Sequence, residues 1–269
     1  MATKILVIGG TGRLGRPVVA LLRDAGCEVR VLTRHPGDGS DVCEHVAGNL
    51  ATGAGLEPAV MGVAAVVNCA GNAKGDEKMA VNLVRAMARA GNPHLVNISV
   101  VGADRVPVRS RADRAMFGYF AAKLGAERVV AASGLPWTTL RASQFYDAFL
   151  WLARQMSKLP VVPVAAGVRF QPVDTGEVAS RVAELALGEP AGLAPEMAGP
   201  RVYGMGELLR GYLTISRRHR LLLPMHMPGG AARVVRGGAN LAPQGATLGS
   251  RTWEEFLANE VGPRTRPPR

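Results

Sequence analysis

Short apolar runs alternate with longer amphipathic segments through the first half of this chain, and this alternation limits the possible folds more than any other feature. The expected strands cover residues 4–10, 28–34, 44–50, 64–71, 94–100 and 136–142, and the expected helices cover 13–26, 76–91 and 120–134. Most of the strands are continuously apolar, which is typical of a parallel sheet buried on both faces. Right-handed crossovers then predict an α/β fold with a doubly wound, Rossmann-like parallel sheet, whose ligand crevice lies at the carboxyl ends of its strands.

The second half of the chain is less regular, because prolines and glycines become frequent after about residue 143. A chain of 269 residues with 48% hydrophobic content can form one large domain with an added lobe. We therefore expect a nucleotide-binding domain over residues 1–143 and a smaller substrate-binding lobe over 144–269. The segment near 173–188, "DTGEVASRVAELALG", has helical spacing and is expected to return to the sheet of the first domain.

The charge and the cysteines restrict the class of protein. The net charge of +11 comes mainly from arginines that are scattered, with dense runs only at 108–114, 216–220 and 263–269, so a solvated basic surface is favoured over nucleic-acid binding. The N-terminal run "MATKILVIGG" reads as a first strand and not as a signal peptide, and no apolar run suggests a membrane partner. The three cysteines are odd in number, which indicates reduced thiols and a cytoplasmic location. Neither the cysteines nor the five dispersed histidines have metal-ligand spacing, so no metal site is expected.

A glycine motif stands where this architecture places a phosphate-binding turn. The stretch "VIGGTGRLGRP" puts Gly9, Gly12 and Gly15 three apart, directly after the first strand and at the start of the first helix. Gly9 is expected to permit the tight turn, Gly12 to let the backbone approach a pyrophosphate, and Gly15 to allow close helix packing. The free amides of the helix N-terminus would bind the pyrophosphate, so the motif predicts a dinucleotide site.

Two arginines indicate which dinucleotide is preferred. Arg13 lies inside the glycine loop, and Arg34 follows the second strand in "VLTRHP", where an acidic residue would select the ribose hydroxyls of NAD. An arginine at that place can bind a 2′-phosphate through two parallel hydrogen bonds and offers no acceptor to a free hydroxyl pair. NADP is therefore expected in preference to NAD.

Tyr119 and Lys123 are four residues apart in "GYFAAKLGAE" and share one face of an expected helix. A cation beside a phenol favours the phenolate, so Lys123 would lower the pKa of Tyr119 and prepare it to exchange a proton with a substrate carbonyl. The alternative is that Tyr119 packs as part of the core while Lys123 alone binds the cofactor. Glu127, one further turn along, is expected to form an ion pair.

These motifs together resemble the short-chain dehydrogenase/reductase superfamily, and more narrowly its atypical NAD(P)H-binding branch of NmrA-like and isoflavone-reductase-like proteins. The resemblance rests on "GGTGRLG", "NCAG", "NISVVGAD", the Tyr119–Lys123 pair and "GLPWTTLRASQF". It covers the first 145 residues well and the rest less specifically. Members of this branch include reductases, quinone oxidoreductases and redox-sensing regulators without catalysis.

The resemblance also assigns roles to individual residues. It implies cofactor contacts by Gly9, Thr11, Gly12, Arg13, Leu14, Gly15, Arg34, Asn68, Cys69, Ala70, Gly71 and Lys123, with Lys123 on the nicotinamide ribose. Ser99, after the fifth strand, falls where the superfamily places the residue that hydrogen-bonds the substrate carbonyl. The usual second hydroxyl is absent here, because Val100 and Val101 follow, so Ser99 is also consistent with a simple strand end.

The wall of the substrate pocket is expected to begin after the sixth strand, with Ser143, Gln144, Phe145 and Tyr146. The predicted function is that of an NADP-dependent oxidoreductase, with Tyr119, Lys123 and Ser99 as catalytic residues, that reduces a hydrophobic carbonyl or quinone-like small molecule. One alternative is a non-catalytic, NAD(P)-sensing, NmrA-like regulator that binds a partner protein. A second alternative is an epimerase- or dehydratase-like enzyme. Neither the substrate nor the oligomeric state follows from the sequence.

Overall fold

The computed structural model describes residues 2–35, 43–71 and 75–262 of the chain, so the basic run at 263–269 lies outside the described residues. Its centre is a nine-stranded sheet in the order β13-β10-β6-β5-β4-β1-β2-β3, with β9 also beside β6. The strands before residue 143 are β1 (Lys4–Ile8), β2 (Glu28–Thr33), β3 (Glu44–Ala47), β4 (Ala65–Asn68), β5 (His94–Val100) and β6 (Trp137–Ala142). Their pairings are parallel, which confirms the expected doubly wound sheet.

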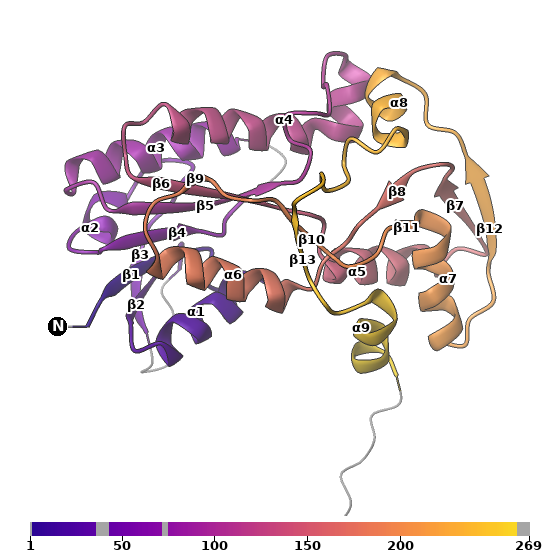
Figure 1. Ribbon diagram of the computed structural model, residues 1–269, viewed down its shortest axis with the longest axis horizontal. Coiled ribbons are helices and arrows are strands. Elements are labelled where there is room, and N and C mark those ends of the chain that lie inside the picture. Colours follow the sequence, from indigo (N-terminus) through magenta and orange to yellow (C-terminus); the bar gives the residue numbers. More distant parts are fainter. Residues whose placement is uncertain (1, 36–42, 72–74, 263–269) are drawn as a thin grey trace, which may run out of the picture.

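Helices cover both faces of this sheet, as Figure 1 shows. One face carries α1 (Gly15–Asp24) and α6 (Thr175–Leu187), and the other carries α2 (Leu56–Val60), α3 (Asp76–Arg89) and α4 (Arg111–Ala131). The central strands are mostly apolar because both of their faces are buried; all seven residues of β5, for example, are buried, although three of them are polar. Within the segment expected to return to the sheet, α6 packs against α1 and against β4, β5 and β6.

Two features of the fold differ from the expectation. Helix α4 begins at Arg111 and not at residue 120, because Ser110 and Asp113 form a capping box in which each side chain accepts a backbone N–H of the other residue. The sheet also gains three short strands from the second half of the chain, β9 (Gly192–Leu193), β10 (Met197–Ala198) and β13 (Thr247–Leu248). Strands of two residues have too little periodicity to be read from a sequence.

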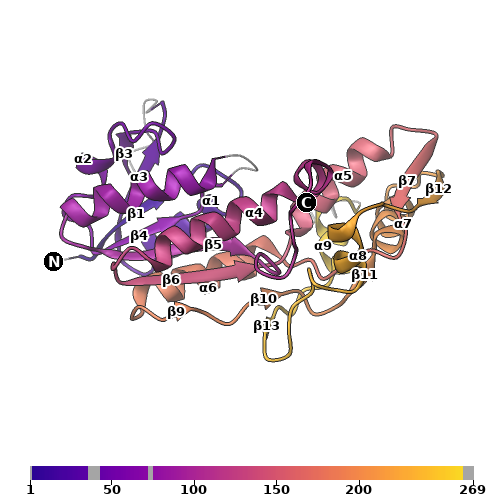
Figure 2. The ribbon, with the colours of Figure 1, turned by 90° about the horizontal axis from the view of Figure 1, so that it is seen from above.

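The remaining elements form a lobe beyond the carboxyl ends of β5 and β6, at one end of the molecule in both Figure 1 and Figure 2. They are α5 (Tyr146–Met156), β7 (Val161–Ala165), β8 (Arg169–Phe170), β11 (Tyr203–Gly204), α7 (Met205–Ile215), β12 (Leu221–Met225), α8 (Gly230–Arg236) and α9 (Trp253–Glu260). The lobe has its own core, in which the rings of Tyr146, Trp253 and Phe256 pack together. Among the described residues, no helix combines the length and the apolar character needed to cross a bilayer.

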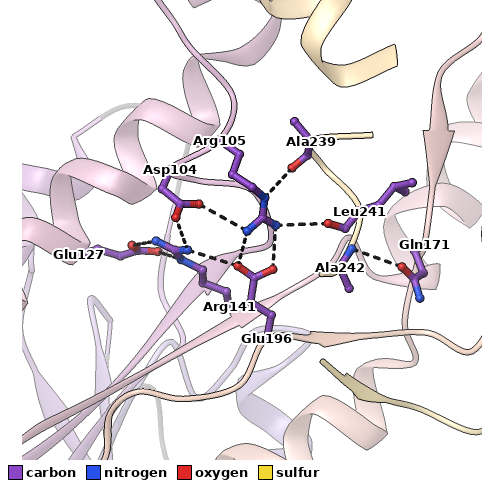
Figure 3. A network of polar contacts seen from close by, with 9 residues as sticks. All are labelled: Asp104, Arg105, Glu127, Arg141, Gln171, Glu196, Ala239, Leu241 and Ala242. Carbon is purple, nitrogen blue, oxygen red and sulfur yellow. Dashed lines mark hydrogen bonds and ion pairs between the residues drawn. The ribbon is translucent and has the colours of Figure 1, made fainter. Parts of the chain in front are cut away.

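A buried network of charges joins the lobe to the sheet (Figure 3). Arg141, at the end of β6, donates Nε to Glu127 Oε1 at 2.9 Å and Nη2 to Glu127 Oε2 at 2.7 Å, and its Nη1 lies 3.2 Å from Glu196 Oε1. Arg105 binds Glu196 through both terminal nitrogens, at 2.9 and 2.8 Å, and also donates to the carbonyls of Ala239 and Leu241. Glu127 therefore does form an ion pair, and its hydrogen bond raises the pKa of Arg141.

Loss of Arg141 from this network should destabilise the protein strongly. Arg141→Met leaves the buried carboxylate of Glu127 without its cation, whereas Glu196 keeps Arg105, and such a loss typically costs about 3–5 kcal/mol of unfolding free energy. Arg181→Met is the matched control, because Arg181 pairs with Glu184 at the surface and should cost less than about 1 kcal/mol. Urea unfolding of both variants measures the difference, and equal losses would show that the buried network contributes no special stability.

Candidate functional site

The glycine loop between β1 and α1 has the geometry of a phosphate-binding turn. Gly9 has a φ of 77°, which favours glycine, and its carbonyl accepts the N–H of Gly12 at 2.9 Å. A Cβ on Gly15 would overlap the carbonyl oxygen of Gly9, so Gly15 allows the close packing that was expected. Leu14, the N-cap residue of α1, makes no side-chain capping bond, and the amides of the first helical turn therefore face the loop without a side-chain acceptor.

Gly12 differs from Gly9 and Gly15, because a Cβ there would meet only the Gly9 carbonyl oxygen, at 3.1 Å, and its φ is not positive. With a single backbone atom near this position, Gly12 is less enclosed than Gly15, which fits the close approach of a pyrophosphate. We predict that Gly12→Ala lowers NADPH affinity at least about tenfold and lowers the melting temperature less than Gly15→Ala does. Gly15→Ala should instead lower the melting temperature. Calorimetric titration beside thermal unfolding checks both, and unchanged NADPH affinity in Gly12→Ala would place the dinucleotide elsewhere.

A cleft of about 540 Å³ opens at the carboxyl ends of β1, β2 and β4. Its lining includes Gly9 and Thr11 of the glycine loop, Arg34 after β2, and Ala70 and Gly71 after β4. Arg34 is exposed at this cleft, and Arg13 is exposed on the loop itself. These groups fit the adenosine and phosphate portions of a dinucleotide, because glycines leave room for the backbone to approach and arginine supplies the cation.

Two residues of the segment Asn68–Gly71 line the cleft, and the other two make contacts that support it. Ala70 and Gly71 line the cleft, whereas Asn68 donates to the side chain of Asn97 at 3.1 Å and accepts the N–H of Ala70 at 3.3 Å. Cys69 packs against the core on the α1 and α6 side. The side chains of Asn68 and Cys69 thus support the loop.

Lys123 lies at the inner end of this loop and is only 5% exposed. Its Nζ donates to the carbonyl of Ile98 at 3.1 Å and lies 3.2 Å from Asp76 Oδ2. A Cβ on Gly71 would overlap Lys123 Nζ, so glycine is needed where the loop passes the ammonium group. The ammonium group is thereby fixed at the carboxyl end of β5, next to the loop that lines the cleft.

Tyr119 lies one helical turn before Lys123, and its ring centroid is 5.8 Å from Lys123 Nζ. Its side chain is 40% exposed, so it is not part of the core. Desolvation of the phenol, together with the charge of Asp76, raises the pKa of Tyr119 to about 12. The expected lowering of the pKa by Lys123 is therefore wrong, because desolvation disfavours the phenolate and the buried carboxylate of Asp76 pairs with the ammonium group.

Ser99 occupies the expected place at the end of β5, but its side chain is 3% exposed. Its Oγ has no hydrogen-bond partner among the described residues. Asn97 lies two residues earlier on the same face of the strand. It is also buried, and its side chain accepts a hydrogen bond from Asn68. Ser99 Oγ thus remains a buried, unpaired polar atom next to the site, which is uncommon in folded proteins.

The four residues expected in the substrate wall separate into two pairs. Tyr146 is completely buried and donates its hydroxyl to the carbonyl of Arg251 at 2.8 Å, and Ser143 is 3% exposed and donates to the carbonyl of Gln171 at 2.6 Å. These two side chains belong to the lobe's core, which corrects the expectation that they face a pocket. Gln144 and Phe145 are half-buried, and Gln144 Oε1 has no partner among the described residues.

Asp76 is the site residue that sequence reasoning missed. It begins α3 directly after Gly75, where an acidic residue in a first turn is ordinary and reads only as helix support. Its burial and its pairing with Lys123 depend on how α3 packs beside α4, a tertiary contact that no local pattern reports. The sequence does show Asn97 inside the mainly apolar run "HLVNISV". A polar residue in a buried strand could have indicated that polar side chains lie beneath the site.

The comparisons with known proteins agree with this geometry. A family model described as NAD(P)H-binding matches residues 9–169. The chain belongs to the NAD(P)H-binding family. The matched segment begins at Gly9 and includes the glycine loop, the cleft and Lys123, so the family model and the geometry identify the same region.

Individual relatives of this NAD(P)H-binding chain are reductases. A Streptomyces griseus protein named (4-alkanoyl-5-oxo-2,5-dihydrofuran-3-yl)methyl phosphate reductase is 33% identical over 206 residues, which are 73% of this chain and 68% of that protein. The structure of an NADPH-dependent quinone oxidoreductase of Escherichia coli in complex with NADPH matches with a TM-score of 0.77 at 18% identity. The match covers 95% of this chain and 99% of that chain. A triphenylmethane reductase of Citrobacter sp. has a TM-score of 0.76 at 17% identity, with coverages of 96% and 99%. The expected NAD(P)H-binding family and the expected oxidoreductase class are confirmed. The solved structures share the expected Rossmann-like fold.

Proposed function

We propose that this protein is an NADPH-dependent reductase of a hydrophobic carbonyl or quinone-like small molecule. The observation that carries the proposal is the continuous path from the glycine loop through Gly71 to the buried Lys123, with the exposed Tyr119 one turn away. The named relatives support it, since one reduces an alkanoyl-substituted oxo-dihydrofuran phosphate and another is a quinone oxidoreductase.

In this proposal the glycine loop and the N-terminus of α1 hold the pyrophosphate, and Arg34 holds the 2′-phosphate. Lys123 donates its remaining N–H to a hydroxyl of the nicotinamide ribose, and Asp76 and the Ile98 carbonyl keep its Nζ in place for this contact. NADPH, when bound, supplies a hydride to the substrate. Tyr119 keeps its proton on the hydroxyl oxygen until negative charge develops on the substrate oxygen, and then donates it. Ser99 Oγ is available as a further hydrogen-bond donor to the bound groups, and Gln144 and Phe145 contact the substrate.

The cofactor preference depends on Arg34. We expect NADPH to bind more tightly than NADH, and Arg34→Asp to erase or reverse the difference, because a charge-assisted contact to phosphate is worth about 1.5–3 kcal/mol, roughly tenfold to a hundredfold in affinity. Arg85→Asp is the control, since Arg85 is an exposed arginine on α3 that does not line the cleft. Fluorescence titration with both cofactors measures the preference. Equal affinities of the unaltered protein for NADPH and NADH would contradict the assignment.

The proposed reductase is tested by turnover beside cofactor binding. NADPH oxidation is followed with a panel of quinones, enones and ketones, while NADPH affinity is measured by calorimetry. Substrate-dependent oxidation supports the reductase. Tight NADPH binding without turnover of any member favours the sensing regulator, and product formation without net NADPH consumption favours the epimerase- or dehydratase-like enzyme.

A further inference from the structure

Strands β7 and β12 form a two-stranded parallel ribbon at the far end of the lobe, with Val161 opposite Leu221 and Pro163 opposite Leu223. The inner face of this ribbon is buried, because Val162 and Val164 are 1% and 7% exposed and pack in the lobe's core. A ribbon with one buried face normally carries polar residues on the other face.

The outer face of this ribbon is instead apolar and exposed. Val161 is 40% exposed, Leu221 65%, Leu223 49% and Met225 52%, and Leu159 in the preceding turn is 48% exposed. These five side chains lie in two adjacent, aligned segments, because the register places Leu221 beside Val161. A contiguous row of exposed aliphatic side chains on a sheet face indicates an interaction surface.

Positive charges flank this row without acidic neighbours in the chain. Residues 148–173 and 208–253 contain no aspartate or glutamate, so every formal side-chain charge in them is positive. Arg218 Nη1 donates to Ser157 Oγ at 3.2 Å and Arg220 Nε to the Ser157 carbonyl at 2.9 Å, which fastens both arginines beside the turn before β7. A hollow of about 560 Å³ there is also lined by Arg210 and Arg217.

We propose that this lobe tip, defined as residues 157–161 and 217–225 together with Arg210, docks on the surface of an anionic lipid bilayer. Aliphatic side chains enter the interfacial region while arginines pair with lipid phosphates, and neither group alone accounts for the surface. A second copy of the chain is disfavoured as the occupant, because it would bring like-charged arginines together. Nucleic acid is disfavoured because the row is aliphatic and offers no aromatic platform for bases. Docking on a bilayer surface needs no spanning helix, so it is compatible with the lack of such a helix among the described residues.

Vesicle flotation tests the proposal with two kinds of vesicle, phosphatidylcholine alone and equal parts of phosphatidylcholine and phosphatidylglycerol. We expect binding to the anionic vesicles only, weakened by salt. Leu221→Gln/Leu223→Gln should abolish it, and Arg210→Gln/Arg217→Gln should weaken it about fivefold for each charge removed. The side chains of these two arginines make no hydrogen bond or ion pair with the described residues, and NADPH binding should be unchanged in both variants.

The controls are Met61→Gln and Arg85→Gln, which remove an exposed apolar side chain and an exposed charge from the nucleotide-binding domain and should bind vesicles normally. Equal binding to both kinds of vesicle, or lobe-tip variants that bind like the unaltered protein, would overturn the proposal. Binding of duplex DNA by a protein that does not bind either kind of vesicle would also overturn the proposal. A dimer that becomes a monomer in Leu221→Gln/Leu223→Gln, again without vesicle binding, would assign the face to self-association.

Discussion

Replacing Lys123 with methionine is expected to weaken NADPH binding about tenfold to a hundredfold and to destabilise the fold by about 3–5 kcal/mol. The first effect follows from loss of the proposed contact to the nicotinamide ribose. The second follows because Asp76, which is 4% exposed, loses the cation that lies 3.2 Å from its carboxylate. Calorimetric titration and urea unfolding measure the two effects separately.

The double variant Asp76→Asn/Lys123→Met separates the binding role of Lys123 from its structural role. Removing both charges takes away the buried carboxylate together with the ammonium group, so most of the stability should return while the affinity for NADPH stays low. If the double variant binds NADPH like the unaltered protein, Lys123 serves only as the partner of Asp76.

Replacing Tyr119 with phenylalanine is expected to lower kcat about 10²–10⁴-fold, the usual contribution of a positioned general acid. NADPH affinity and stability should remain unchanged, because the side chain is 40% exposed and its hydroxyl makes no hydrogen bond with the described residues. Tyr212→Phe is the control, since it removes a hydroxyl from the lobe's core. A Tyr119→Phe variant that turns over substrate at the unaltered rate would assign proton delivery to another group or to water.

The pH profile gives a second readout for Tyr119. Because its pKa is raised to about 12, the phenol stays protonated, and able to donate, throughout the neutral range. Activity should therefore show no loss from deprotonation of Tyr119 between about pH 6 and pH 9. If the pKa of Tyr119 were lowered instead, activity would fall as the pH rises through the neutral range. That fall would be absent in Tyr119→Phe.

Much of the nucleotide-binding half could be predicted because its signals are local. The central strands β1, β4 and β5 are mainly apolar, and the turn after β1 shows its glycines directly in the sequence. The early start of α4 was missed because "RSRADRAMFGY" has no clear apolar stripe, and its Ser110–Asp113 cap is a weak signal. The lobe was predicted only as a region, since its short strands pair with segments far away in the chain.

The site shows the same division between local and tertiary information. Spacing placed Tyr119 and Lys123 on one helical face, but the sign of the pKa shift depended on desolvation of the phenol and on Asp76, which reaches Lys123 from another helix. Polar residues after β6 suggested a substrate wall, whereas Ser143 and Tyr146 are buried by contacts with residues 171 and 251. The exposed row on β12 reads as an ordinary apolar strand, because a sequence does not show that both faces of the ribbon are apolar.

The fate of deuterium at the hydride-donating carbon of NADPH tests the proposed reductase most directly. The two stereoisomers of deuterated NADPH are oxidised in single turnovers with an active quinone or carbonyl compound, and the resulting NADP⁺ is weighed by mass spectrometry. A protein that holds the nicotinamide through Lys123 exposes one face of the ring, so one isomer should lose its deuterium completely and the other should keep it. Mixed retention from both isomers, or no substrate-dependent oxidation of NADPH by a protein that binds it, would contradict the account.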